Sequence, residues 1–174
     1  QIAAEQRDAV DVFLCETLAS VKEIKAAVKA AAETGRPVWC GMTVLDEDGT
    51  RLRSGEPLDQ AANAARQAGA HALLINCSWP EAITQAMPVL AAEGLPFGGF
   101  ANGFTGIAAL DHGGTVDVLE TRNDLGPEQY ANHAFDWIAA GATIVGGCCE
   151  VGPDHISKLA QQLEQAGHTI TGSL

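Results

Sequence analysis

The sequence predicts an α/β fold built on a parallel sheet. Five short apolar runs alternate with helical patterns along the 174 residues. The runs are continuous rather than alternating, which is typical of parallel strands that are covered on both faces. Strand–helix–strand units of this kind are connected by right-handed crossovers. No Gly-x-Gly-x-x-Gly follows the first run and no P-loop sequence occurs, which disfavours the nucleotide-binding versions of such folds.

Turn and cap residues set the limits of the strands along the chain. Gly35 ends the first long helical pattern, as a glycine beyond a helix C-terminus does, and a turn over 46–49 follows the second run. A long loop separates the fourth run from the fifth. The predicted strands are Asp11–Cys15, Pro37–Val44, His71–Asn76, Pro96–Phe100 and Ala142–Gly146.

Each strand is followed by a helical pattern. Ser20 is a favourable N-cap for the first helix, Gly69 ends the second, and Pro127 is a favourable first residue for the fourth. Gly152 and Pro153 mark the place where the last helix could begin. The predicted helices are Val21–Ala32, an alanine-rich segment after Pro57, Pro80–Ala92, Pro127–Ala140 and Asp154–Ala166.

The composition excludes several classes of partner. With 22 acidic and 10 basic residues, the net charge of −12 gives no electrostatic reason to bind nucleic acid or an anionic membrane. No apolar run approaches the ~20 residues of a membrane span, and the first residues show no signal-peptide order, so we expect no leader. Five cysteines, an odd number, suit reduced thiols and a cytoplasmic location better than a disulfide framework.

Residues suited to chemistry follow the predicted strands. A (β/α)₈ barrel gathers its active-site residues at this carboxyl edge of the sheet, although five units are too few to close such a barrel. The candidates are Glu16, Thr43, Asn76, Cys77, Asn102, Cys148 and Cys149.

The adjacent cysteines Cys148 and Cys149 are the most informative of these candidates. Two glycines precede the pair and Gly152 follows it, so a sharp turn can direct both thiols to one metal ion. With Cys77 at the end of another strand, three thiolates would bind Zn²⁺ and leave a fourth position open, the catalytic pattern. The alternatives are small buried cysteines or a redox pair, and Cys77 alone would indicate a buried core residue.

An ordered set of segments resembles the homocysteine S-methyltransferase family of zinc-dependent barrel enzymes. The similarity extends over essentially the whole chain, and the Asn-Cys and Gly-Gly-Cys-Cys elements together are specific to the family. The segments are Leu14–Leu18, Leu74–Ile83, Tyr130–Trp137, Gly141–Cys149 and Gly152–Ile156.

The resemblance implies a TIM-type (β/α)₈ barrel of which residues 1–174, as a single domain, cover about strands four to eight. We therefore expect strands one to three, and the glycine-rich first loop that helps to hold the amino acid, to be missing from this sequence.

Two positions depart from the family pattern. Asn102 lies in Ala-Asn-Gly where relatives commonly have Pro-Asn-Ala-Gly or Pro-Asn-Ser-Gly, and Glu150 replaces a common glycine.

The resemblance also implies a reaction. Homocysteine would be the methyl acceptor and methionine the product, with S-methylmethionine or S-adenosylmethionine as the donor. Cys77, Cys148 and Cys149 would hold the zinc, which activates the substrate thiol, so that no separate protein nucleophile is needed. Glu16 would bind the ammonium group of the substrate. Asn76 and Asn102 complete the predicted substrate-binding set.

Other interpretations remain open at this point. Glu16 could be a solvated loop carboxylate and Asn76 a turn-forming residue. Betaine could be the donor and selenocysteine the acceptor. The chain could also be a non-catalytic zinc-binding barrel fragment or a redox module that uses the vicinal cysteines. Since an incomplete sheet exposes an apolar edge, an oligomer is possible.

The remaining cysteines and aromatic residues are predicted to be structural. Cys15 and Cys40 lie within apolar runs and are expected in the core. Trp79, Trp137 and Tyr130 are expected to pack on helices.

Overall fold

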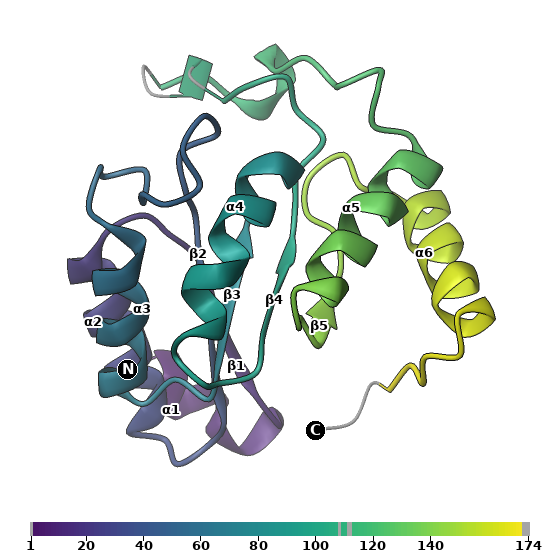
Figure 1. The fold of residues 1–174 in the computed structure, drawn as a ribbon. Helices are drawn as coiled ribbons and strands as arrows, with labels where there is room; N and C mark the ends of the chain where they lie inside the picture. Colours follow the sequence, from purple (N-terminus) through teal and green to yellow (C-terminus); the bar gives the residue numbers. More distant parts are fainter. Residues whose placement is uncertain (1, 108, 111–112, 172–174) are drawn as a thin grey trace.

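Five parallel strands form one sheet in which they are arranged in chain order (Figure 1). The computed structural model describes residues 2–107, 109–110 and 113–171. Every neighbouring pair is parallel, as the sequence predicts. The strands are β1 (Phe13–Leu18), β2 (Val38–Met42), β3 (Ala72–Asn76), β4 (Phe97–Phe100) and β5 (Ile144–Val145).

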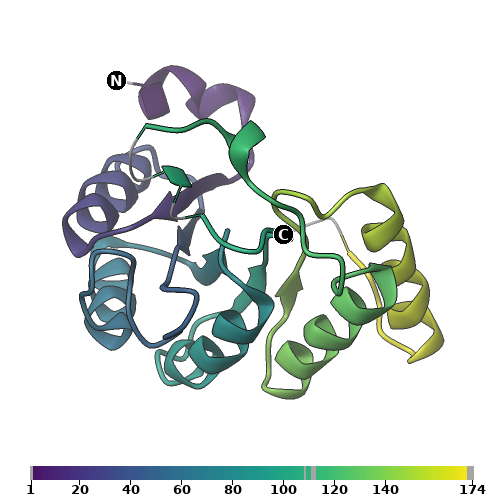
Figure 2. The ribbon, with the colours of Figure 1, turned by 90° about the horizontal axis from the view of Figure 1, so that it is seen from above.

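The five helices that follow the strands form one layer on the outside of the sheet (Figure 2). Each of them packs on the next helix along the chain. They are α2 (Val21–Ala32), α3 (Leu58–Ala68), α4 (Pro80–Ala91), α5 (Pro127–Ala139) and α6 (Pro153–Gln165). A sequential parallel sheet with its helices outside is the arrangement of (β/α)₈ barrels, so the predicted fold class is confirmed.

Helices cover one face of the sheet rather than both, although the central strand β3 is buried along its whole length. The connecting helices lie on one face only, because the strands follow one another in a single direction and every right-handed crossover returns to the same side. On the opposite face Leu14 is 43% exposed and Trp39 is only partly buried.

The hydrophobic core lies between the sheet and the helix layer. Met42, Leu73 and Ile75 point from the strands toward fully buried helix residues such as Ile24 and Ile83. The alanines of α3 contribute a small-residue face: Ala61, Ala62 and Ala65 are all fully buried.

Local sequence signals determine the first helix boundaries. Ser20 and Glu23 form a capping box at the start of α2, in which the Glu23 N–H donates to Ser20 Oγ at 3.3 Å and Glu23 Oε2 accepts from the Ser20 N–H at 3.0 Å. Gly69 ends α3 with a φ of +106°, a left-handed conformation that glycine adopts without strain.

Some elements differ from the prediction. Three short elements were not predicted from the sequence: α1 (Ile2–Gln6) and the 3₁₀ turns η1 (Arg7–Ala9) and η3 (Val116–Val118). These elements contain no fully buried residue, so no apolar periodicity marks them. β5 is two residues long rather than five, and β1 starts two residues later and ends three residues later than expected.

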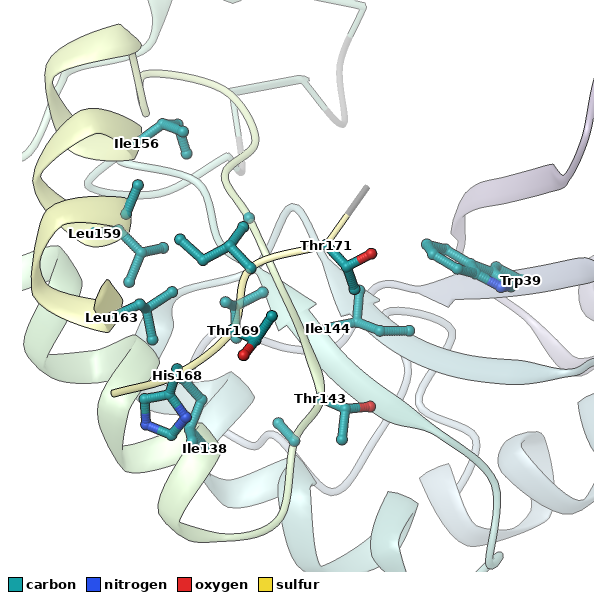
Figure 3. A pocket seen from close by; sticks show the side chains of 15 residues that line it. Trp39, Ile138, Thr143, Ile144, Ile156, Leu159, Leu163, His168, Thr169 and Thr171 are labelled. Carbon is teal, nitrogen blue, oxygen red and sulfur yellow. The ribbon is translucent and has the colours of Figure 1, made fainter. Parts of the chain in front are cut away.

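An apolar cavity of about 640 Å³ lies between β5, α6 and residues 168–171. In Figure 3, Ile156, Leu159 and Leu163 of α6 project into it, with Trp39 of β2 on the other side. No cysteine and no predicted substrate residue lines this cavity. The candidate site therefore lies elsewhere, at the carboxyl ends of the strands.

Candidate metal centre

Three cysteine thiols converge at the carboxyl edge of the sheet. Cys77 directly follows β3, whereas Cys148 and Cys149 lie in the loop between β5 and α6. Their Sγ atoms all lie within 4.8 Å of one another, and those of the adjacent pair are 3.9 Å apart. Cys77 and Cys148 are partly buried, and Cys149 is exposed. Parallel pairing thus brings together thiols that are far apart in the sequence.

The arrangement of the thiols fits a soft metal ion such as Zn²⁺. Zn–S bonds of about 2.3 Å at tetrahedral angles place two sulfurs about 3.8 Å apart, close to the separation of Cys148 and Cys149. Within the described part of the chain, the group contains no fourth His, Cys, Asp or Glu. Three protein ligands and one open position are the pattern of catalytic rather than structural zinc sites.

The segment that follows β4 holds the cysteine pair in place. The Cys148 N–H donates to the Ala101 carbonyl oxygen at 2.9 Å, and the Cys149 carbonyl oxygen accepts from the Gly103 N–H at 2.9 Å. These bonds extend the β4–β5 pairing past the ends of both strands. The position of the pair is therefore set by the main chain on either side of Asn102.

Asn102 is fully buried and lies beside the cysteine cluster. Its Nδ2 faces the Sγ of Cys77 at 3.9 Å, and its Oδ1 accepts from the Phe104 N–H at 3.1 Å. Its own N–H donates to the Ser78 carbonyl oxygen at 3.1 Å. The side chain is thus oriented by the loop, with its amide nitrogen directed at a thiol.

Asn76 is also fully buried, and its amide binds β1. Its Oδ1 accepts from the Thr17 N–H at 2.9 Å, and its Nδ2 donates to Thr17 Oγ1 at 2.8 Å. The register of β1 shifts between Cys15 and Leu18, and Thr17 has a φ of +60°. Asn76 therefore stabilises a β-bulge in β1.

Glu16 lies within this bulged strand, which corrects the expectation that it follows the strand end. β1 continues because Leu18 pairs again with Met42 of β2 after the irregularity. The Glu16 side chain is exposed. Since bulges redirect side chains, the Asn76–Thr17 contact sets the position of the segment that presents Glu16.

The three thiols differ in acidity. A hydrogen bond with Cys148 lowers the pKa of Cys77, against the opposing effect of burial. The same interaction, followed by burial, raises the pKa of Cys148, and burial is the main cause of the raised pKa of Cys149. The thiols are thus coupled to one another, and the thiolate is the form that binds metals.

The two other cysteines are structural, as expected. Cys40 is fully buried in the core, and burial raises its pKa to about 12. Cys15 packs against the core from β1, and burial raises its pKa as well. Neither belongs to the three-thiol group.

Tyr130 has a role at the site that was not predicted from the sequence. Its ring is fully buried on α5, as a packing residue should be, but its hydroxyl reaches the loops after β4 and β5. It accepts from the Ala101 N–H and donates to the Gly146 carbonyl oxygen. The available signal was a tyrosine at a core position of a helix, because a buried hydroxyl needs a partner.

Comparison with known proteins assigns the chain to a family. The family model described as Homocysteine S-methyltransferase matches residues 1–163. The chain is 31% identical over 152 residues to homocysteine S-methyltransferase of Escherichia coli (strain K12), which covers 86% of this chain and 46% of that protein. It is 28% identical over 168 residues to betaine–homocysteine S-methyltransferase 1 of Bos taurus. This match covers 88% of this chain and 40% of that protein. The chain thus spans less than half the length of these relatives.

Solved structures show the same relationship. The metallated form of the homocysteine methyltransferase MmuM from Escherichia coli superposes with a TM-score of 0.66 at 28% identity, covering 90% of this chain and 47% of that chain. The carboxyl transferase domain of Rhizobium etli pyruvate carboxylase, at 16% identity and a TM-score of 0.61, covers 95% of this chain and 28% of that chain and shares the fold alone. The family match over nearly all of the sequence decides the assignment: the chain belongs to the homocysteine S-methyltransferase family.

Proposed function

We propose that this protein transfers a methyl group from a sulfonium donor to the thiol of homocysteine, giving methionine, with Zn²⁺ held by Cys77, Cys148 and Cys149. The observation that carries the proposal is the convergence of three thiols, within 4.8 Å of one another, in a member of this family. S-methylmethionine and S-adenosylmethionine are the donors that we propose.

The charge of the site supports a cationic donor. When bound, Zn²⁺ supplies a Lewis-acid position at which a substrate thiol stays deprotonated at neutral pH. The thiolates of Cys77, Cys148 and Cys149 outnumber the two positive charges of the ion, so the site is negative. A negative site favours reaction with a sulfonium, because opposite charges are neutralised in the transition state.

The chain's own residues would bind and orient the amino acid. We assign the exposed carboxylate of Glu16 to the ammonium group, supported by its place on a bulge that Asn76 holds through Thr17. Asn102 is assigned to substrate binding because its amide nitrogen lies against the Cys77 sulfur. Orienting the thiol and the donor in this way supplies much of the rate enhancement.

A cytoplasmic location is part of the proposal. All five cysteines carry free thiols, which suits a reducing compartment. In the described residues no helix is both long and apolar enough to cross a membrane.

Metal content provides the first test, because it does not depend on the rest of the substrate site. We expect the protein to carry about one zinc per chain, measured by elemental mass spectrometry, and Cys77→Ala and Cys149→Ala to lose it. Cys15→Ala is the matched control, since Cys15 lies outside the thiol group and should leave the zinc content unchanged. Methionine formation from homocysteine and either sulfonium donor should follow the zinc content.

Two results would contradict the proposal. Full methionine formation in Cys77→Ala or Cys149→Ala would show that the cysteines are not the metal ligands. A vicinal disulfide between Cys148 and Cys149, with the same number of titratable thiols in the presence and absence of a chelator, would instead favour the redox function.

A further inference from the structure

Arg53 reaches the cysteine cluster from a loop that supplies none of its thiols. It lies between β2 and α3, and its side chain is only 20% exposed. Its Nη2 donates to the Cys77 carbonyl oxygen at 3.2 Å and to Asp46 Oδ1 at 3.1 Å, and its Nε donates to Thr43 Oγ1 at 3.0 Å. One guanidinium therefore binds three acceptors, one of which is the carbonyl oxygen of Cys77, the residue directly after β3.

Cys77 has a backbone conformation that needs such support. Its φ of +51° lies in the left-handed region, which disfavours residues with a side chain and persists only where the surroundings impose it. The Cys77 N–H is fixed by the Phe100 carbonyl oxygen at 3.2 Å. On the other side, the Cys77 carbonyl oxygen accepts from Arg53 and, at 3.4 Å, from Thr43 Oγ1.

The same loop binds the two residues that follow Cys77. Asp46, whose side chain is 7% exposed, accepts from the Trp79 N–H at 3.0 Å as well as from Arg53. Ser78 Oγ accepts from the Val44 N–H at 3.0 Å. Removing the guanidinium would leave the carboxylate of Asp46 nearly buried without its cation, so Arg53 also stabilises this anchor.

We propose that Arg53 is a positioning residue of the three-cysteine site. By holding the Cys77 carbonyl, it keeps the Cys77 Sγ directed at Cys148 and Cys149, within reach of a shared metal ion. The inference rests on the proposed function in so far as that function makes the cluster a metal site. A lysine cannot replace Arg53, because one ammonium nitrogen does not match three acceptors arranged around a planar fork.

The test compares Arg53→Met and Arg53→Lys with Arg51→Met. Arg51 is a matched control two residues away: its side chain is 52% exposed and pairs with Asp48 at the surface. The affinity for Co²⁺, followed by the visible absorption of the thiolate-bound ion, should fall about 10- to 100-fold in both Arg53 variants. Arg51→Met should bind as the wild type does. Full affinity in Arg53→Lys would overturn the positioning role and leave only an effect of charge.

A second measurement needs no metal, and it distinguishes a displaced Cys77 from a general loss of stability. Diamide oxidises two nearby thiols to a disulfide, and peptide mass spectrometry gives the share of Cys77 that becomes linked to Cys148 or Cys149. That share should fall several-fold in Arg53→Lys and Arg53→Met, in samples shown by circular dichroism to be as folded as Arg51→Met. An unchanged share together with unchanged Co²⁺ affinity would overturn the proposal.

The two readouts separate this inference from the proposed function. If the wild-type protein binds no Co²⁺, the metal function fails, while a reduced Cys77 cross-link in the Arg53 variants would still support the positioning role. If wild type and Arg53 variants bind Co²⁺ equally and cross-link equally, the metal site stands and Arg53 does not position it.

Discussion

Gly147 approaches Val151 so closely that a Cβ on residue 147 would lie 2.3 Å from Cγ1 of Val151 and 2.7 Å from its Cβ. These two residues bracket Cys148 and Cys149. The Val151 N–H also donates to the Cys148 carbonyl oxygen at 3.1 Å. The cysteine pair therefore lies in a tight turn whose two sides are in contact, and a side chain at residue 147 would force this turn open.

Gly147→Ala should destabilise the protein and spread the thiols apart. Overpacking of this kind typically costs about 1–3 kcal/mol of unfolding free energy, measurable by chemical denaturation. The double variant Gly147→Ala/Val151→Ala should recover part of the loss, because the closest methyl group is removed. Strictly additive losses in this double-mutant cycle would show that the contact with Val151 is not the cause.

Tyr130→Phe should loosen the loop that carries Cys148. The hydroxyl accepts from the Ala101 N–H at 3.0 Å and donates to the Gly146 carbonyl oxygen at 2.5 Å, so its loss removes the partner of one buried and one partly buried backbone group. We expect a loss of about 1–3 kcal/mol of stability and a fall of about tenfold in Co²⁺ affinity.

A control for Tyr130→Phe lies on the same helix layer. Thr84→Val removes the oxygen that accepts from Trp137 Nε1 at 2.9 Å, and Trp137 is two helical turns away from Tyr130 on α5. The stability of Thr84→Val should fall without a change in its Co²⁺ affinity. Equal affinity losses in the two variants would mean that general destabilisation, rather than the Tyr130 hydroxyl, weakens metal binding.

The parts of the fold that could be predicted from the sequence depend on local patterns. Continuous apolar runs gave the strands, and the glycines near Cys148 and Cys149 indicated a turn able to direct both thiols to one point. The bulge at Glu16 could not be predicted, since it depends on the contact of Thr17 with Asn76, which lies 59 positions away in the chain. Arg53 was missed for the same reason: its acceptors lie on two different loops.

The continuous apolar run also predicted too many residues for the last strand. Residues 142–146 form a continuous apolar run, but only Ile144 and Val145 pair with Gly98 and Gly99 of β4. A run of apolar residues reports burial, whereas strand length depends on how far the partner strand extends. β4 is itself only four residues long, so the pairing ends early.

Glu81→Gln should reveal a pH-dependent contribution to stability. Glu81 binds Arg122 through two hydrogen bonds of 2.8 Å, and this interaction lowers the pKa of Glu81. A lowered pKa stabilises the fold at pH values above the ordinary glutamate pKa of about 4.3, and the effect is lost as the pH falls through the lowered value. The melting temperature of Glu81→Gln should thus lie below that of wild type at pH 7.

The difference between Glu81→Gln and wild type should shrink steadily on acidification below pH 4 and disappear once Glu81 is protonated in both states. Glu47→Gln, which alters an exposed carboxylate in the turn after β2, serves as the control and should show little difference at any pH. A difference for Glu81→Gln that persists unchanged in acid would attribute the effect to packing rather than to the ion pair with Arg122.

Gly41→Ala should separate substrate binding from metal binding. A Cβ on Gly41 would lie 2.9 Å from Asn76 Oδ1 and 3.2 Å from the Cα of Glu16, so it would push Asn76 away from Thr17 and shift the bulged strand. We expect homocysteine affinity, measured by calorimetry on the zinc-loaded protein, to fall about tenfold or more, a loss of about 1.4 kcal/mol. Co²⁺ affinity should stay unchanged, since the cysteine loops are held by other contacts.

Gly106→Ala, where a Cβ meets nothing within 4 Å, is the control. Parallel losses of homocysteine and Co²⁺ affinity in Gly41→Ala would show that the Glu16 bulge and the cysteine cluster cannot be perturbed independently.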